Sequence, residues 1–136
     1  AIGAKLGAEG REVIAIIGDG GYQMTCNELG TILQTKAAVK IVVLNNGYLG
    51  MVRQWQELFF DKRYASTEMI SPDFVKLAKA YDIEATRVSK RENLEEAIKT
   101  MIQSKEAFFL EVVIEKEDNV FPMIPSGASV SDIRLK

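Results

Sequence analysis

Residues 13–21 read VIAIIGDGG, an apolar run that ends in glycines around a single aspartate, Asp19. Residues 41–46 read IVVLNN, so a second apolar run ends in two amides, Asn45 and Asn46. Both runs are apolar throughout, which is typical of parallel strands that are covered on both faces. In open α/β sheets, ligands bind at the carboxyl ends of the strands. The two stretches therefore predict a parallel sheet that brings Asp19 and Asn46 together at one edge.

Strand and helix patterns alternate along the rest of the chain, which predicts a three-layer α/β domain with a mostly parallel sheet. Residues 61–70 have weak periodicity and are expected to be irregular. Ser71 is the expected N-cap of one helix, and Asn93 with Glu96 has the spacing of a capping box at the start of another. We expect strands over 13–17, 41–44, 85–88 and 108–114, and helices over 24–35, 51–60, from Ser71 to about Tyr81, and 93–103.

The composition excludes several classes of function. The length of 136 residues fits one domain, and a net charge of −2 gives no basic surface for nucleic acid. No apolar run reaches the ~20 residues that a membrane-spanning helix needs. The chain has no histidine, so Ser-His-Asp catalysis and histidine zinc sites are excluded within it. The single cysteine, Cys26, excludes an internal disulfide framework and favours a reducing compartment such as the cytoplasm.

The glycine cluster at 18–21 has several interpretations. It can be a plain turn from a strand to a helix. A dinucleotide site is disfavoured, because the third glycine of that motif and an acidic residue at the end of the next strand are absent. A P-loop is disfavoured because the Gly-Lys-Ser/Thr sequence is absent. A diphosphate held through a metal remains: Asp19, the amide oxygen of Asn46 and the carbonyl of Tyr48 are oxygen donors that suit Mg²⁺.

The residues from Gly18 to Gly20, followed by Asn45-Asn46 after residues 21–44, match the thiamine diphosphate motif of the thiamine-dependent enzymes. Residues 45–56, NNGYLGMVRQWQ, resemble a segment of the catalytic large subunit of acetohydroxyacid synthase, also called acetolactate synthase. Residues 71–78 resemble the next helix of that family, and 119–129 resemble its C-terminal closing segment. The chain is thus identified as the C-terminal thiamine diphosphate-binding domain of that family over 1–136, with 119–136 as the closing segment.

The resemblance implies thiamine diphosphate and Mg²⁺ as cofactors, and FAD for the full-length family but not for this domain. The implied reaction joins the two-carbon unit of decarboxylated pyruvate to pyruvate or 2-ketobutyrate, in the synthesis of branched-chain amino acids. It implies a homodimer or higher oligomer and raises a regulatory small subunit as a partner. The implied metal ligands are Asp19, Asn46 and Tyr48, and the implied substrate residues are Met51 and Trp55. The implied cofactor-binding residues are Gly18, Asp19, Gly20, Gly21, Asn46, Tyr48, Leu49, Gly50 and Met51.

The resemblance also implies that parts of the enzyme lie outside these residues. The chain opens as the end of a helix without an initiator methionine, so we expect a piece of a longer polypeptide. In this family the glutamate that activates the cofactor comes from an N-terminal domain. We therefore expect no catalytic residue in this fragment and no synthase activity from it alone.

Three alternatives stay open at this stage. The chain can belong to another thiamine diphosphate enzyme, such as a pyruvate oxidase, a glyoxylate carboligase or a 2-keto acid decarboxylase. It can be an interaction module that keeps the fold and holds no cofactor. Finally, Met51, Trp55, Phe59 and Phe60 have the spacing of an ordinary core stripe on a helix.

Overall fold

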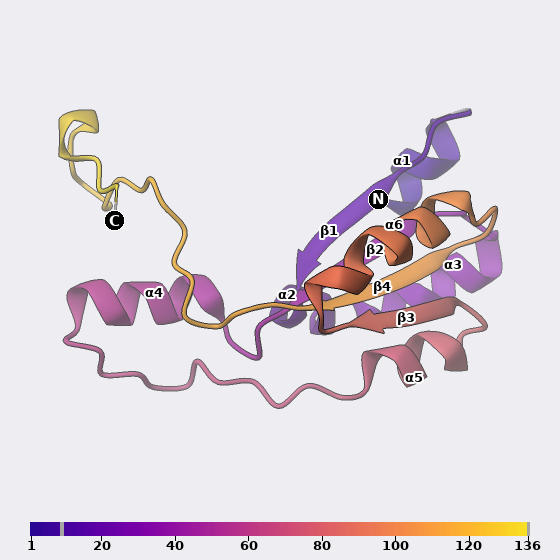
Figure 1. The fold of residues 1–136 in the computed structure, drawn as a ribbon. Coiled ribbons are helices and arrows are strands. Elements are labelled where there is room, and N and C mark those ends of the chain that lie inside the picture. Colours follow the sequence, from indigo (N-terminus) through magenta and orange to yellow (C-terminus); the bar gives the residue numbers. More distant parts are fainter. Residues whose placement is uncertain (9, 136) are drawn as a thin grey trace.

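A computed structural model describes residues 1–8 and 10–135, and its centre is a parallel sheet of four strands (Figure 1). The strand order is β1-β2-β4-β3, and all three neighbouring pairs are parallel. The four predicted strands are confirmed, with ends that differ by at most one residue. Their bounds are β1 (Ile14–Gly18), β2 (Lys40–Asn45), β3 (Glu84–Val88) and β4 (Phe108–Val113).

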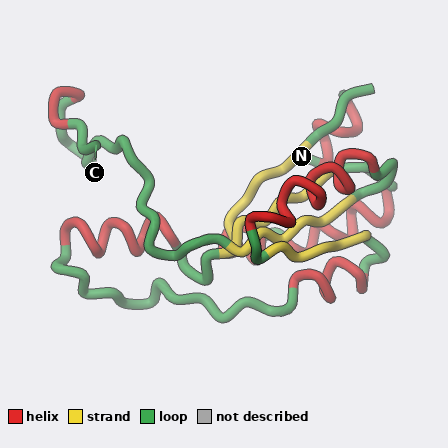
Figure 2. Tube along the Cα trace, in the orientation of Figure 1, coloured by secondary structure: helices red, strands yellow, loops and turns green. Residues whose placement is uncertain are grey.

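Helices cover both faces of this sheet, so the predicted three-layer architecture is confirmed. Helices α2, α3 and α5 pack on one face, and α6 packs on the other (Figure 1). Three short 3₁₀ turns add to these helices: Cys26–Glu28, Arg91–Asn93 and Val130–Asp132. The last of them is the red coil near the C-terminus in Figure 2, at the end of a long loop coloured green. The helices are α1 (Ile2–Gly7), α2 (Asp19–Gln23), α3 (Leu29–Thr35), α4 (Gly50–Phe59), α5 (Phe74–Ala80) and α6 (Leu94–Gln103).

The central strand β4 explains why its sequence is apolar without alternation. Phe109 belongs to the core under α3 and α5, whereas Phe108 and Leu110 belong to the core under α6. All three are at most 1% exposed. The ring of Tyr22 lies 5.1 Å from the ring of Phe109 and 5.1 Å from that of Phe74, centroid to centroid, and joins α2 and α5 to the sheet. The strand is apolar because each of its faces is buried.

The prediction that strand β1 is covered on both faces is wrong for the residues that the structure describes. Ile14 and Ile16 are 44% and 70% exposed. Helix α6 packs over β3 and β4, and β1 lies at the opposite edge of the sheet. The outward side of β1 therefore has no helix above it.

The predicted helix over 24–35 is also wrong in its extent. Helix α2 begins at Asp19, directly after the strand, and the helical path breaks at Thr25, where φ is −133°. A 3₁₀ turn precedes α3, which starts only at Leu29. The glycines at 20 and 21 have low helix propensity. Burial of the Tyr22 ring against two phenylalanines nevertheless requires a helix that begins directly after the strand.

Two predicted helix starts differ in their capping residues. Asp73, and not Ser71, caps α5, because its side chain accepts a hydrogen bond of 3.2 Å from the backbone N–H of Lys76. The capping box at Asn93 and Glu96 is absent: the backbone of Asn93 is already near-helical, and its side chain makes no cap bond. A 3₁₀ turn leads into α6 and replaces the extended N-cap geometry that a capping box needs.

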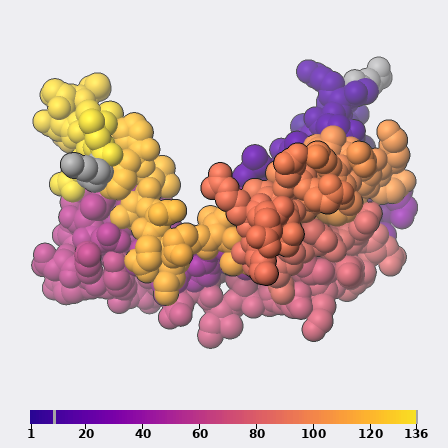
Figure 3. Space-filling view, viewed as in Figure 1, coloured from indigo at the N-terminus to yellow at the C-terminus, as the bar shows by residue number. Residues whose placement is uncertain are grey.

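Helix α4 and the C-terminal segment form a lobe beside the sheet, and the surface is hollowed between this lobe and α6 (Figure 3). Gln54, 1% exposed, donates to the carbonyl of Val120 (2.9 Å) and accepts from its N–H (2.8 Å). Arg53 makes a 2.7 Å ion pair with Glu117. Residues 61–70 are irregular, as predicted, and lead from α4 back to α5. The last residue of the predicted closing segment 119–136 lies outside the described residues.

The cap of α5 gives a pH-dependent prediction. The N–H of Lys76, with help from the guanidinium of Arg87, lowers the pKa of Asp73 below its ordinary value. Asp73→Ala is therefore expected to lower the thermal midpoint at neutral pH, where the ionised cap is present in the wild type. The difference in thermal midpoint between wild type and Asp73→Ala should be lost as the pH falls through the lowered pKa, below about 4, and calorimetry across pH measures it.

Asp73→Asn is the control, since an asparagine cap has no charge to lose. A pH-independent difference for Asp73→Ala would contradict the charge contribution.

Candidate functional site

A cavity of about 380 Å³ lies at the carboxyl edge of the sheet, where the chain leaves β1 and β2. Its walls come from the β1–α2 turn, from the turn between β2 and α4, and from the first residues after β4. The side chains of Asp19 and Asn46 share this cavity, as the sequence predicted. The lining residues are Gly18, Asp19, Gly20, Gly21, Leu44, Asn46, Tyr48, Leu49, Gly50, Met51, Val52 and Ile114.

Parallel pairing of β1 with β2 brings the two turns together. Gly18 is the register partner of Leu44, so the residues that follow each of them leave the sheet side by side. Gly18 is extended at the start of α2, and the next residue, Asp19, is already helical and buried. Neither turn forms the site alone, because the first turn supplies the carboxylate of Asp19 and the second supplies the amide of Asn46.

Among the residues that line the cavity, Asp19 is the one whose pKa is shifted. It is 1% exposed, and its Oδ2 atom is buried without a hydrogen-bond partner. Burial raises the pKa of the Asp19 carboxyl, and the nearby backbone N–H groups of Asp19, Gly20, Gly47 and Asn46 partly offset that rise. A buried carboxylate oxygen without a partner is unfavourable unless a cation or a donor satisfies it. The site therefore fits a metal ion on this oxygen.

The turn after β2 is held by its own side chains. Asn45 Oδ1 accepts from the N–H of Gly47, and Asn46 Oδ1 accepts from the N–H of Tyr48, both at 3.1 Å. Gly47 has φ of +69°, a conformation that favours glycine. Residues 67–69 brace the turn from outside: the N–H of Leu49 donates to Thr67, and the N–H of Met69 donates to Gly47. The position of the Asn46 amide is thus fixed by short local bonds.

Glycines make room for this arrangement. A Cβ atom on Gly20 would lie 2.7 Å from Leu49 Cδ2 and 2.9 Å from Met69 Sδ. A Cβ atom on Gly50 would lie 3.0 Å from the Asn46 amide nitrogen. Any larger residue at these two positions would push on the cavity wall or on the Asn46 side chain.

The metal donors available here are few. Among residues 1–8 and 10–135, no three His, Cys, Asp or Glu side chains lie close enough to hold a metal ion. The cavity offers one carboxylate, one amide and backbone carbonyls, so a bound ligand would need to supply further oxygens. This set suits Mg²⁺ that is shared with a diphosphate, because Mg²⁺ in proteins is commonly bound by one or two carboxylates together with substrate phosphates.

Of the residues predicted from the sequence, Trp55 is the one that the structure does not bring into this cavity. It lies one helical turn beyond Met51 on α4, and its ring packs on that of Phe59 at 5.2 Å. Met51 itself lines the cavity and is 53% exposed. Sequence reasoning missed Leu44, Val52 and Ile114. The signal for Ile114 was its place directly after the last strand, where its N–H donates to the carbonyl of Asn45.

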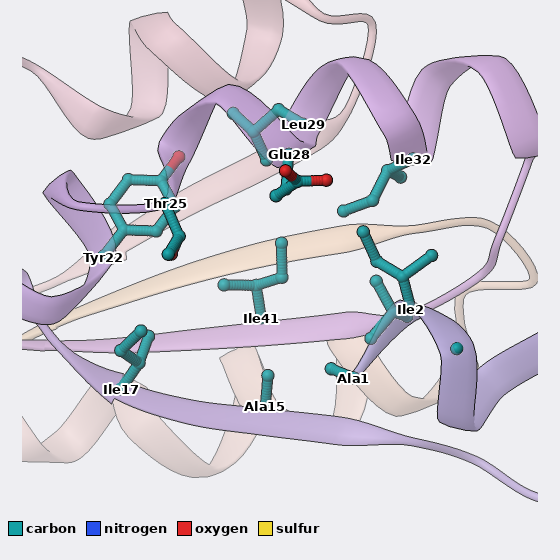
Figure 4. A pocket seen from close by; sticks show the side chains of 12 residues that line it. Ala1, Ile2, Ala15, Ile17, Tyr22, Thr25, Glu28, Leu29, Ile32 and Ile41 are labelled. Atoms are coloured by element: carbon teal, nitrogen blue, oxygen red, sulfur yellow. The ribbon is translucent and has the colours of Figure 1, made fainter.

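A second cavity, of about 400 Å³, lies between α1, β1 and α3 (Figure 4). Its walls are mostly apolar, and the carboxylate of Glu28 points among them. Glu28 accepts a 2.7 Å hydrogen bond from the Thr31 hydroxyl. This cavity shares no lining residue with the site of Asp19 and Asn46. Separately, none of the helices in the described part of the chain has the length and apolar character needed to cross a membrane.

The fold and the cavity at its strand ends define a domain of the thiamine diphosphate-dependent enzymes. Residues 1–112 match the family "Thiamine pyrophosphate enzyme, C-terminal TPP binding domain", and the chain belongs to this family. This confirms the predicted fold class and the resemblance to thiamine-dependent enzymes.

Proteins named as acetolactate synthases are similar to the whole chain. It is 41% identical over 137 residues to the acetolactate synthase isozyme 2 large subunit of Escherichia coli K12, covering 100% of this chain and 25% of that protein. It is 44% identical to the mitochondrial acetolactate synthase of Schizosaccharomyces pombe, covering 99% of this chain and 20% of that protein. The chain thus spans a fifth to a quarter of these relatives.

A solved structure gives the same class. The thiamine diphosphate-dependent 4-hydroxybenzoylformate decarboxylase of Rhodococcus jostii RHA1 superposes with a TM-score of 0.78 at 30% identity. The match covers 85% of this chain and 22% of the decarboxylase. The fold is therefore shared across members that carry different activities.

The close packing at Gly20 gives a prediction about stability. Gly20→Ala is expected to lower the free energy of unfolding by about 1–3 kcal/mol, because the new methyl overlaps Leu49 and Met69. Gly3→Ala is the matched control: Gly3 is also helical, and nothing lies within 4 Å of its Cβ position. The control should keep or raise stability by up to ~1 kcal/mol. Urea denaturation measures both variants, and equal behaviour of the two would contradict the packing argument.

Proposed function

We propose that this chain forms the cofactor- and metal-binding part of an acetolactate synthase catalytic subunit. The observation that carries the proposal is the buried, unpartnered oxygen of Asp19, a residue that lines the same cavity as Asn46. The specific activity is supported by 41–44% identity to acetolactate synthases over essentially the whole chain. The proposed reaction joins a two-carbon unit from pyruvate to a second 2-keto acid, pyruvate or 2-ketobutyrate.

In this proposal Asp19, Asn46 and the carbonyl of Tyr48 hold Mg²⁺. The backbone at Gly18, Gly20 and Gly21 approaches the diphosphate, and Leu49, Gly50 and Met51 form the opposite wall. Thiamine diphosphate supplies the electron sink for decarboxylation when it is bound.

The chain's own residues would prepare this site before any ligand arrives. Burial disfavours the ionised form of Asp19, so a divalent cation would replace the missing stabilisation. The apolar side chains of Leu44, Leu49 and Ile114 would exclude water from the same cavity. In such a desolvated place, charge interactions are stronger than in water.

Further parts of the proposal rest on the family resemblance of the sequence alone. They comprise a homodimer or higher oligomer, FAD in the complete protein, a regulatory small subunit, and 119–136 as a segment that closes over the site. None of the described residues from 119 on lines the cavity, so closure would require movement of this segment. A cytoplasmic location is proposed from the single cysteine, whereas the relative from Schizosaccharomyces pombe is named as mitochondrial.

The metal site is tested by Asp19→Asn in the purified protein. Titration calorimetry of thiamine diphosphate should give binding that requires Mg²⁺, is lost with EDTA, and weakens by at least about tenfold in the variant. Binding should also weaken as the pH falls through the raised pKa of Asp19, because the proton then competes with the metal.

The control for this test is Asp82→Asn, an exposed position with φ of +56°, which asparagine tolerates. Asp82→Asn should bind as the wild type does. Without cofactor, Asp19→Asn should unfold at the same temperature as the wild type or higher, since a buried unpartnered charge is removed. Wild-type affinity in Asp19→Asn would remove this residue from the proposed metal site.

From the family resemblance we also propose that Trp55, a substrate residue in that resemblance, forms a wall that favours the larger acceptor, 2-ketobutyrate. The acceptor preference tests this role. In an active synthase that contains this chain, Trp55→Leu should lower the preference for 2-ketobutyrate over pyruvate by 10-fold or more, the size of ~1–3 kcal/mol of discrimination. Competition between the two acceptors, with both products measured, gives the ratio. Phe59→Leu, one turn along the same helix, should leave the ratio unchanged. An unchanged product ratio in Trp55→Leu would contradict a role in acceptor preference, and Trp55 would then serve only to pack against Phe59.

A further inference from the structure

Glu111 is a charged side chain in the middle of the sheet. It lies on the central strand β4, opposite Val43 of β2 and Arg87 of β3, and is 2% exposed. Its neighbours along the strand, Phe109 and Leu110, are fully buried apolar residues. A buried charge costs desolvation energy, and an apolar side chain at such a place is often as stable or more stable. The buried carboxylate of Glu111 is therefore not explained by stability alone.

The two carboxylate oxygens of Glu111 have different partners. Oε2 accepts from Arg87 Nε at 2.7 Å, and Oε1 accepts from Asn45 Nδ2 at 2.8 Å. Arg87 also donates to Asp73 Oδ1 at 3.1 Å. Four side chains thus form a chain of hydrogen bonds from Asp73, the N-cap of α5, to Asn45, the last residue of β2.

The contact to Asn45 dictates which way its amide faces. An ionised carboxylate can only accept, so Asn45 must present its NH₂ group to Glu111. The Oδ1 atom of Asn45 is then turned towards the turn, where it accepts from the N–H of Gly47 at 3.1 Å. Reversal of the amide would bring two oxygens together and would point an NH₂ group at an N–H.

This turn carries the proposed metal ligands. Asn46 lies between Asn45 and Gly47, and the backbone N–H groups of Asn46 and Gly47 are among those close to the Asp19 carboxyl. A change in the Asn45–Gly47 bond would therefore displace the Asn46 amide relative to Asp19. Groups that orient metal ligands in this way commonly affect metal affinity by about 10–100-fold.

We propose that Glu111 is a positioning residue: it holds the Asn45 amide in one orientation and so sets the turn that carries Asn46 and Tyr48. The inference rests on the proposed function, because the turn matters for binding only if Mg²⁺ and a diphosphate occupy the cavity. Glu111 itself does not line the cavity and touches no ligand in this proposal.

The test substitutes Glu111→Gln, which keeps the shape but can either donate or accept, so it no longer dictates the amide of Asn45. Mg²⁺-dependent binding of thiamine diphosphate should weaken about tenfold in Glu111→Gln and in Asn45→Ala. Because Glu111 acts through Asn45, the double variant should bind no more weakly than Asn45→Ala alone. Losses that multiply in the double variant would overturn the inference.

The matched control is Lys40→Met, which removes another fully buried charge from the sheet. Lys40 lies at the opposite end of β2, where its Nζ donates to the carbonyls of Ser104 and Glu106. This variant should change the unfolding midpoint and leave cofactor affinity at the wild-type value. Equal losses of affinity in Lys40→Met and Glu111→Gln would show that Glu111 acts only through general stability, and would overturn the inference.

A second measurement needs no ligand. Exchange of the Gly47 amide hydrogen, followed by NMR, should be about tenfold faster in Glu111→Gln than in the wild type, and unchanged in Lys40→Met. Unchanged exchange in Glu111→Gln overturns the positioning of the turn, whatever the cofactor affinity. Faster exchange in a protein whose wild type binds no thiamine diphosphate overturns the proposed function and supports the positioning. The two proposals therefore fail separately.

Discussion

The parallel pairing of β1 with β2 is the constraint on which the rest of the structure depends. It aligns two apolar runs that are far apart in the sequence, so that Gly18 and Leu44 lie opposite each other. The chain must then leave both strands at the same edge, which is the general reason that open α/β sheets bind ligands there. Asp19 and the Asn45–Asn46 pair become neighbours through this alignment, and a shift of register would separate them.

The site that results is unusual in how little charge it contains. One carboxylate is buried with an unpartnered oxygen, and the nearest side-chain donors are amides whose oxygens already accept backbone N–H groups. Short polar side chains and glycines therefore shape the cavity, while apolar residues from β2, from the start of α4 and from the position after β4 enclose it. Such a site is organised by backbone geometry, and binding of the proposed cation would depend on the oxygens that a ligand supplies.

The residue pattern predicted the sheet, its strands and the meeting of Asp19 with Asn46, because glycine, aspartate and asparagine at strand ends are tied to local geometry. Cavity residues such as Leu49, Gly50 and Met51 were predicted only through the family resemblance. It did not predict that α2 starts at Asp19, since the burial of Tyr22 between Phe74 and Phe109 is a tertiary effect that overrides glycine propensity. The exposure of Ile16 could not be predicted either, because strand order decides which strand lies at the edge. The link from Glu111 to Asn45 depends on register across β2 and β4, and no local pattern reports it.

The lobe of α4 and the tail has a thermodynamic consequence. Gln54 and Arg53 fasten α4 to residues 116–120. The lobe is joined to the sheet by the turn between β2 and α4, by the irregular residues 61–70 and by the residues that follow β4. Regions with few buried contacts to the rest of a protein generally open at a smaller free energy than its core strands. Because Met51 and Val52 at the start of α4 line the cavity, such an opening would widen the entrance while the sheet stays intact. Entry and exit of a large anionic molecule can then be governed by a subglobal fluctuation, and its rate can be tuned by residues that never meet that molecule.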